Sequence, residues 1–146
     1  MKKRLTLIQM NVHVNDVEYN YNRVQELLAQ SLSENPDIIV LPETWNTGFY
    51  PSKDLINIAD RNGARTQSLL STFAKEHNVN IIGGSVAVTK DDVVFNTSYA
   101  YNREGTLVGE YSKMHGFSPA KEDKYFANGT HTTHFELDGI PCSTII

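Results

Sequence analysis

The chain of 146 residues has the length of one ordinary domain, with 40% hydrophobic and 21% charged residues and a formal net charge of −4. This composition is typical of a globular domain, and the negative charge disfavours nucleic-acid or anionic-lipid partners, because both bind basic surfaces. No apolar run approaches the roughly 18 residues that a membrane-spanning helix needs.

A strand is predicted over residues 5–12, after a basic start at residues 1–4. A basic start before apolar residues can be a signal peptide, but this stretch is short and broken by Thr6 and Gln9, so export is not expected. The single cysteine, Cys142, excludes an internal disulfide and fits a reducing compartment. We therefore expect a cytoplasmic protein.

An amphipathic helix is predicted from Asp16 to about Ser33. Asn15 is a candidate N-cap, because Glu18 follows it at the spacing of a capping box. Apolar residues recur at helical intervals at Val17, Tyr21, Val24, Leu28 and Leu32. The sequence Glu34-Asn35-Pro36 then ends the helix.

The four apolar residues 38–41 are typical of a strand buried on both faces, which Pro42 ends. Strand, helix and strand in this order predict a parallel pair of strands with a crossover. Glu43 therefore lies at the carboxyl end of a buried strand, where open α/β sheets bind their ligands. It is a candidate general acid or base, and the alternative is that it caps the next turn.

Residues 51–61 show no clear pattern, and Asn62-Gly63 is a turn signal. A second helix is predicted over residues 64–77 and a third strand over residues 79–88. Gly83-Gly84 inside that strand indicates a bulge or the close approach of another backbone. The alternative, a phosphate-binding loop, would need a longer glycine pattern that opens a helix.

Two further strands, over residues 93–101 and 106–112, are joined by a hairpin loop that ends at Gly105. The second half of the chain is therefore antiparallel, and the sequence predicts an α/β fold with a mixed sheet and helices on it. Lys113 follows the second of these strands. Taken alone, it is either a functional lysine or a solvated charge at a strand end.

A polar loop follows over residues 115–133, and loops of this length tend to be functional or disordered. His131 and His134 lie within or next to it, but the five histidines lack the spacing of a zinc site, and no metal is expected. Residues 134–137 and 140–146 are predicted strands around an Asp138-Gly139 turn. The last strand is apolar and β-branched with no cap after it, so we expect it to be central and buried, and the chain to be a fragment.

Four motifs occur in a fixed order along residues 5–146. They are Leu-Pro-Glu-Thr-Trp around Glu43, Gly-Gly-Ser in the third strand, Tyr-Ser-Lys-Met-His-Gly-Phe around Lys113, and Glu122 with Gly129 seven residues later. With them the chain resembles the N-terminal half of a nitrilase-superfamily carbon–nitrogen hydrolase. The histidine two residues after the lysine, His115, makes it most similar to the omega-amidase-like branch.

The resemblance implies an αββα sandwich, in which the mixed sheet predicted for this chain carries helices on one face. It also implies a Glu–Lys–Cys triad. Glu43 matches the general base, Lys113 the lysine, and Glu122 a second glutamate that positions the substrate or the lysine. His115 is expected to help to position the substrate. The family's nucleophilic cysteine would follow Ile146.

Cys142 is not expected to be that nucleophile. If its strand runs parallel to the strand before Glu43, Cys142 lies four residues, or roughly 13 Å, short of the active edge. We interpret it as a buried structural thiol.

The resemblance thus implies that residues 1–146 are one partial hydrolase domain, truncated at its C-terminal end. The intact protein would cleave a small non-peptide amide, such as a 2-oxo-acid ω-amide, without a cofactor, and would form a homodimer or a higher homo-oligomer. The alternatives are a truncated, catalytically inactive fragment and a non-catalytic α/β module.

Overall fold

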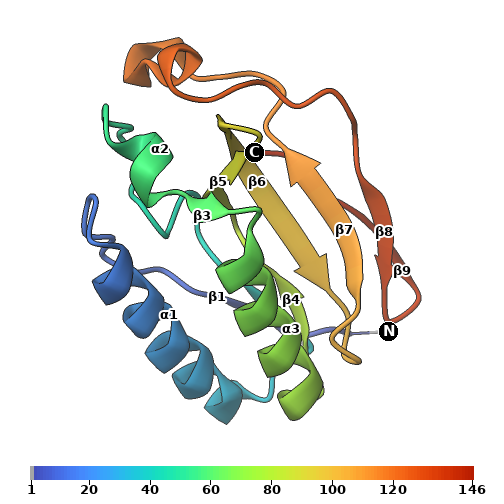
Figure 1. The fold of residues 1–146 in the computed structure, drawn as a ribbon. Helices are drawn as coiled ribbons and strands as arrows, with labels where there is room; N and C mark the ends of the chain where they lie inside the picture. The colour runs from blue at the N-terminus through green and yellow to red at the C-terminus, as the bar shows by residue number, and fades with distance from the viewer. Residues whose placement is uncertain (1) are drawn as a thin grey trace.

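The computed structural model describes residues 2–146, in which two helices cover one face of a mixed sheet (Figure 1). The long helices are α1 (Val17–Ser31) and α3 (Ala64–His77). The sheet contains β1 (Leu5–Leu7), β2 (Ile38–Val40), β3 (Asp60–Arg61), β4 (Asn80–Ile82), β5 (Val86–Lys90), β6 (Val93–Tyr101) and β7 (Leu107–Ser112). The remaining elements are α2 (Leu55–Ile58), the 3₁₀ turns η1 (Leu32–Glu34), η2 (Ser118–Ala120) and η3 (Glu122–Lys124), and the hairpin β8 (His134–Leu137) and β9 (Ile140–Ser143). The predicted fold class is confirmed.

The sheet changes from parallel to antiparallel at β6. β1, β2 and β4 are parallel neighbours, so that Ile39 of β2 lies opposite Ile81 of β4. β6 runs antiparallel to β4 near Tyr101, to β5 near its start, and to β7 along its other edge. The carboxyl end of β7 therefore lies beside the middle of β6, where Ser112 is opposite Thr97.

The predicted third strand is divided into β4 and β5 by Gly83, Gly84 and Ser85. Gly84 has φ +58, and a Cβ atom at this position would lie 2.0 Å from the carbonyl oxygen of Pro42. The backbone N–H of Ser85 donates to the same carbonyl at 3.0 Å. Gly84 therefore marks the close approach of another backbone, namely the segment that leads to Glu43, whereas Gly83 lies against Leu70 and the backbone of Tyr99.

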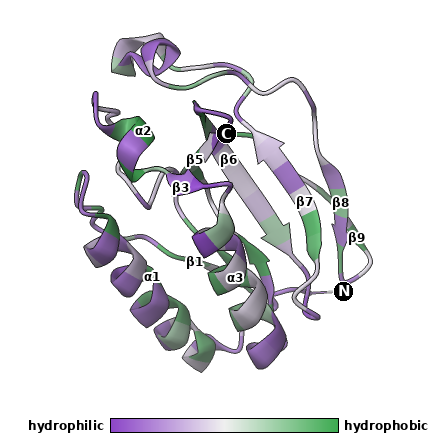
Figure 2. Ribbon diagram, in the orientation of Figure 1, coloured by the Kyte–Doolittle hydropathy of each residue, from purple (hydrophilic) through white to green (hydrophobic). Residues whose placement is uncertain are grey.

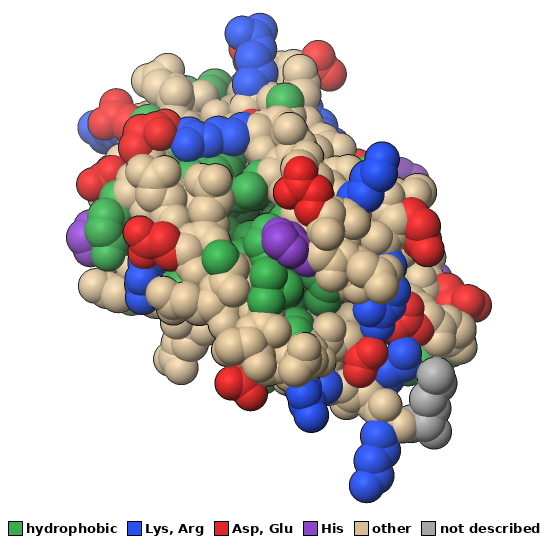
Figure 3. Space-filling model, turned by 90° about the horizontal axis from the view of Figure 1, so that it is seen from below, with side chains coloured by type: hydrophobic (Ala, Val, Ile, Leu, Met, Phe, Trp, Pro, Cys, Tyr) green, Lys and Arg blue, Asp and Glu red, His purple; other side chains and the backbone are tan. Residues whose placement is uncertain are grey.

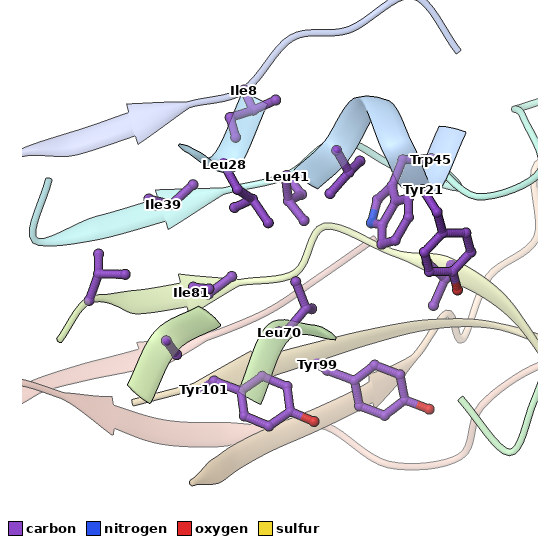
Figure 4. Packing of buried hydrophobic residues seen from close by; sticks show 14 of the residues in the cluster. Ile8, Tyr21, Leu28, Ile39, Leu41, Trp45, Leu70, Ile81, Tyr99 and Tyr101 are labelled. Atoms are coloured by element: carbon purple, nitrogen blue, oxygen red, sulfur yellow. The ribbon is translucent and has the colours of Figure 1, made fainter. Parts of the chain in front are cut away.

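The main hydrophobic core lies between the sheet and the two long helices (Figure 4). Leu28 of α1 and Leu70 of α3 are fully buried over Ile39 and Ile81 of the sheet. Tyr99 of β6 is buried in the same core. Hydrophilic residues alternate with hydrophobic ones along both helices (Figure 2). Burial of each large apolar side chain contributes about 1.5–3 kcal/mol, so this layer holds the helices on the sheet.

Helix α1 begins one residue later than a cap at Asn15 predicts. Asn15 has φ +61, and the carboxylate of Asp16 instead accepts a hydrogen bond from the backbone N–H of Tyr19 at 3.1 Å. Glu18 pairs with Arg65 of α3 rather than closing a capping box. Helix α3 has the predicted bounds.

The first strand is shorter than the predicted residues 5–12, because the chain leaves the sheet after Ile8. The N–H of Ile8 makes the last hydrogen bond to β2, at 2.9 Å from the carbonyl oxygen of Val40. The side chain of Asn20 then holds both backbone groups of His13, at 2.9 and 2.7 Å. The short elements α2 and β3 lie in residues 51–61, where the sequence shows no clear pattern.

The prediction of a central, buried last strand is wrong for the residues that the structure describes. β9 ends at Ser143 and pairs antiparallel with β8 in a separate hairpin, and Ile145 is 85% exposed. The hairpin packs through Phe135 on Gly109 of β7, where a Cβ atom would lie 2.6 Å from the phenyl ring. Nothing within residues 2–146 covers the rest of β9, which explains its exposure.

The surface below the helices and the hairpin is mixed in character. Figure 3 shows hydrophobic side chains in a central hollow with Lys, Arg, Asp and Glu side chains around it. Among residues 2–146, no helix is both long and apolar enough to cross a lipid bilayer.

Candidate active site

Glu43 lies at the start of a turn that follows β2. Its carboxylate oxygen Oε1 accepts hydrogen bonds from Lys113 Nζ at 2.9 Å and from Asn96 Nδ2 at 3.0 Å. Its side chain is 35% exposed. Among residues 2–146, the donors that reach this carboxylate are Lys113 and Asn96 rather than the backbone of the following turn, so the structure favours the interpretation of Glu43 as part of a polar site.

The turn after Glu43 is fixed to β5 by hydrogen bonds. Thr44, which has φ +43, donates its backbone N–H to Ser85 Oγ at 2.9 Å. The side chain of Asn46 bonds both backbone groups of Ala87, at 2.9 and 3.0 Å, as a neighbouring strand would. All of these residues are buried. These buried hydrogen bonds hold the turn after Glu43 in one conformation, although Thr44 has a strained backbone.

Lys113 lies directly after β7 and is held by backbone hydrogen bonds on both sides. Its N–H donates to the carbonyl of Asn96, and its carbonyl accepts from the N–H of Gly129, at 2.9 and 2.8 Å. Its side chain is only 12% exposed and lies between two carboxylates. Lys113 is therefore not a solvated charge at a strand end.

Glu122 belongs to η3 and is the buried member of the group, with 1% exposure. Lys113 Nζ lies 3.2 Å from its Oε1 and 3.0 Å from its Oε2. Oε2 also accepts the backbone N–H of Phe117 at 2.6 Å. Both oxygens of Glu122 are thus occupied, and its role in the structure is to hold the lysine and the loop before η3.

The electrostatic balance keeps Lys113 charged. Burial by itself lowers the pKa of a lysine, but the hydrogen bonds to Glu43 and Glu122 outweigh it, so that the pKa of Lys113 lies above its ordinary value of 10.5. At neutral pH the site therefore presents a fixed ammonium group next to a half-exposed carboxylate. Such a group can stabilise an oxyanion that forms beside it.

The structure does not bring every predicted residue together. His115 is exposed and forms no hydrogen bond with Glu43, Lys113 or Glu122. Cys142 is half-buried on β9 rather than fully buried as predicted, and its Sγ donates a hydrogen bond to the carbonyl of Ile140 at 3.3 Å. β9 is antiparallel to β8 and does not join the sheet of β2, so the parallel arrangement that we considered for Cys142 does not occur.

Sequence reasoning missed Asn96 and Asn46, which position the site, and included Ser85 only as part of the Gly-Gly-Ser motif without a role. The sequence contains a signal for Asn96, because asparagine is depleted in strands and this one interrupts the β-branched and aromatic run of β6. Residues 2–146 contain no group of three or more His, Cys, Asp or Glu side chains that could hold a metal ion.

Comparison with known proteins gives a consistent result. The family described as carbon-nitrogen hydrolase matches residues 4–146. The chain is similar to a 2-oxoglutaramate amidase from Bacillus subtilis (strain 168), with 37% identity over 146 residues, which cover 100% of this chain and 56% of that protein. An omega-amidase from Xenopus tropicalis is 31% identical over 116 residues, which cover 80% of this chain and 41% of that protein.

Solved structures show the same fold. A CN-hydrolase superfamily protein from Xanthomonas campestris, with an arsenic adduct in its active site, has a TM-score of 0.84 at 28% identity and covers 97% of this chain and 51% of that chain. A cysteine-to-alanine mutant of an amidase from Nesterenkonia sp. AN1, in complex with butyramide, has a TM-score of 0.84 at 17% identity and covers 98% of this chain and 55% of that chain. This chain spans about half the length of the curated relatives that it matches.

Proposed function

Because this chain belongs to the carbon–nitrogen hydrolase family, we propose that the complete protein is an amidase that cleaves a small non-peptide amide. Residues 1–146 would be the N-terminal part of its single αββα hydrolase domain. One observation carries the proposal: the ammonium of Lys113 lies 2.9 Å from Glu43 and 3.0 Å from Glu122. The names of the amidase relatives support it.

In the proposed mechanism the nucleophile is a cysteine that follows Ile146. A thiol with an ordinary pKa of about 8.5 is only a few per cent thiolate at neutral pH, so it needs a base. Glu43 takes the thiol proton while the sulfur forms a bond to the amide carbon. Lys113 stabilises the oxyanion of the tetrahedral intermediate, and Glu122 keeps Lys113 in place.

The second half of the reaction uses the same carboxyl group. Glu43 gives its proton to the leaving nitrogen, the carbon–nitrogen bond breaks, and ammonia departs from a thioester. Glu43 then takes a proton from water, which attacks the thioester to release the carboxylic acid and regenerate the thiol. General acid–base catalysis of this type is worth about 10²–10⁴ in rate.

The two glutamates differ in a way that supports this division of roles. Both oxygens of Glu122 are occupied and the side chain is 1% exposed, so it has no free position for a transferred proton. Glu43 is half-exposed, and both donors that reach it from residues 2–146 bind Oε1. His115, which is exposed two residues after Lys113, is proposed to contact the substrate.

The substrate class we propose is a 2-oxo-acid ω-amide. Its support is the likeness to a 2-oxoglutaramate amidase and to omega-amidases. The test is ammonia release by the complete protein from 2-oxo-acid ω-amides and from simple aliphatic amides. Turnover of the ω-amides with higher kcat/KM is expected, and no turnover of any amide would refute the amidase proposal.

The 146-residue chain by itself should be inactive, because it lacks the proposed nucleophile. We also propose that the complete protein is cytoplasmic and forms a homodimer or a higher homo-oligomer. Light scattering at micromolar concentration would measure the oligomeric state, and a strict monomer would contradict this part of the proposal.

A further inference from the structure

Asn96 is an unusual residue for the interior of a strand. Asparagine is depleted in strands, and this one is 1% exposed in β6. Its Oδ1 is buried with no hydrogen-bond partner within residues 2–146, which is unfavourable for folding. Residues that break a local rule of folding tend to lie at functional sites, so the contacts of Asn96 are informative.

Asn96 contacts both halves of the Glu43–Lys113 pair. Its side-chain Nδ2 donates to Glu43 Oε1 at 3.0 Å. Its backbone carbonyl accepts the N–H of Lys113 at 2.9 Å, and its strand neighbour is Ala87, which the Asn46 side chain clamps. Asn96 therefore fixes both the orientation of the Glu43 carboxylate and the position of the Lys113 backbone.

Both donors to Glu43 bind the same oxygen. Lys113 Nζ and Asn96 Nδ2 converge on Oε1, and no donor from the described residues reaches Oε2. An amide N–H does not give up its proton at neutral pH, so Asn96 can only hold Oε1 as an acceptor. When Glu43 gains a proton, the unoccupied Oε2 receives it and Oε1 keeps both hydrogen bonds.

We infer that Asn96 is a positioning residue that assigns the two oxygens of Glu43, with Oε1 as the anchored atom and Oε2 as the atom that transfers the proton. This inference rests on the proposed function. The thiol proton moves to Oε2, and the same oxygen returns it to the leaving nitrogen. Asn96 itself exchanges no proton with the substrate.

The test compares Asn96→Ala and Asn96→Asp in the complete protein with Ser98→Ala as the matched control. Ser98 is buried two residues along β6, and its hydroxyl has no partner within residues 2–146. Without the amide donor, Glu43 can rotate, and a misplaced catalytic group costs about 10²-fold in kcat with little change in KM.

Asn96→Asp keeps the side-chain volume, so it remains informative if the alanine variant does not fold. It should lose at least as much activity, because it places a second carboxylate beside Glu43. An unchanged kcat in either folded variant would overturn the inference, as would an equal loss of kcat in Ser98→Ala.

A second measurement separates this inference from the proposed function. The rate at which iodoacetamide alkylates the nucleophilic thiol, followed by intact mass, depends on deprotonation by Glu43 and not on amide turnover. If the complete protein cleaves no amide, the amidase proposal fails, yet slower alkylation in Asn96→Ala than in Ser98→Ala still supports the role of Asn96. Equal alkylation rates in these two variants would overturn it.

Discussion

The carboxylate of Glu43 and the ammonium group of Lys113 lie 2.9 Å apart although 70 positions separate them in the sequence. β2 and β7 each end at this point, and Lys113 Nζ reaches Glu122 as well. The lysine is therefore the centre of the site, with one carboxylate that is buried and one that is half-exposed.

Replacing this lysine should affect both stability and activity. Lys113→Met leaves the buried carboxylate of Glu122 without its cation, and breaking such a pair typically costs about 3–5 kcal/mol. Activity should fall by at least about 10²–10³ from the loss of oxyanion stabilisation. Urea unfolding and ammonia release measure the two effects.

Lys90→Met is the matched control for this variant. Lys90 pairs with Glu110 at the surface, where the two side chains are 35% and 39% exposed. Loss of an exposed pair should cost less than about 1 kcal/mol and leave activity unchanged. Equal destabilisation by the two variants would contradict the role of Lys113 as the partner of a buried carboxylate.

Glu43→Gln, unlike Lys113→Met, should reduce activity while leaving stability nearly unchanged. The amide oxygen of glutamine can still accept from Lys113 and Asn96, and the side chain is 35% exposed, so the free energy of unfolding should change little. The amide cannot take a proton, so the rate of ammonia release should drop by about 10²–10⁴. A variant that keeps wild-type activity would remove Glu43 as the general base.

The sequence predicts the local elements of this fold well, because their signals are local. Leu70 and Ala74 recur on one face of α3, and the bounds of that helix agree with the pattern at both ends. The residues 93–101 of β6 also agree, because a β-branched and aromatic run is followed by a turn signal. The motifs around Glu43 and Lys113 further locate the strand ends where the site lies.

The parts that sequence reasoning missed depend on contacts between distant segments. Asn46 and Ser85 fix the Glu43 turn through hydrogen bonds that span 41 positions each, and no local pattern reports such a contact. The β9 strand was expected to be buried because its residues are apolar. Burial also needs a partner, and β9 pairs only with β8 among the residues that the structure describes.

Gly84→Ala should be strongly destabilising. Its φ of +58 is unfavourable for alanine, at about 1–2 kcal/mol, and the new Cβ would lie 2.0 Å from the carbonyl oxygen of Pro42. Relief of that clash must move the segment that carries Glu43, so activity should fall together with stability. Thermal unfolding and amide turnover measure both.

Gly139→Ala isolates the effect of the backbone conformation in that comparison. Gly139 has φ +77 in the β8–β9 turn, and an added Cβ would meet no atom within 4 Å. The stability of this variant should therefore fall only by the conformational cost of about 1–2 kcal/mol, and its activity should be unchanged. If it is destabilised as much as Gly84→Ala, the contact with Pro42 has no energetic role.

The ion pairs that attach the β8–β9 hairpin to the rest of the chain should weaken at acidic pH. Asp138 in the hairpin turn accepts from Arg103 at 2.8 and 2.7 Å and from Lys3 at 2.7 Å. The hydrogen bonds from Arg103 are the largest effect, and together with Lys3 they hold the pKa of Asp138 far below its ordinary value of 3.8. Because the pKa is lower in the folded state, this contribution to stability is present above pH 3.8 and is lost as the pH falls below that value.

Asp138→Asn tests this pH dependence directly. The variant should unfold at lower urea concentration than the wild type at pH 7, and the difference should shrink as the pH falls below about 4, because protonation removes the same charge from the wild type. Glu136→Gln is the control, because Glu136 lies on the same hairpin with an exposed side chain and no ion pair within residues 2–146. A difference between wild type and Asp138→Asn that stays constant from pH 7 to pH 3 would show that the carboxylate charge does not hold the hairpin in place.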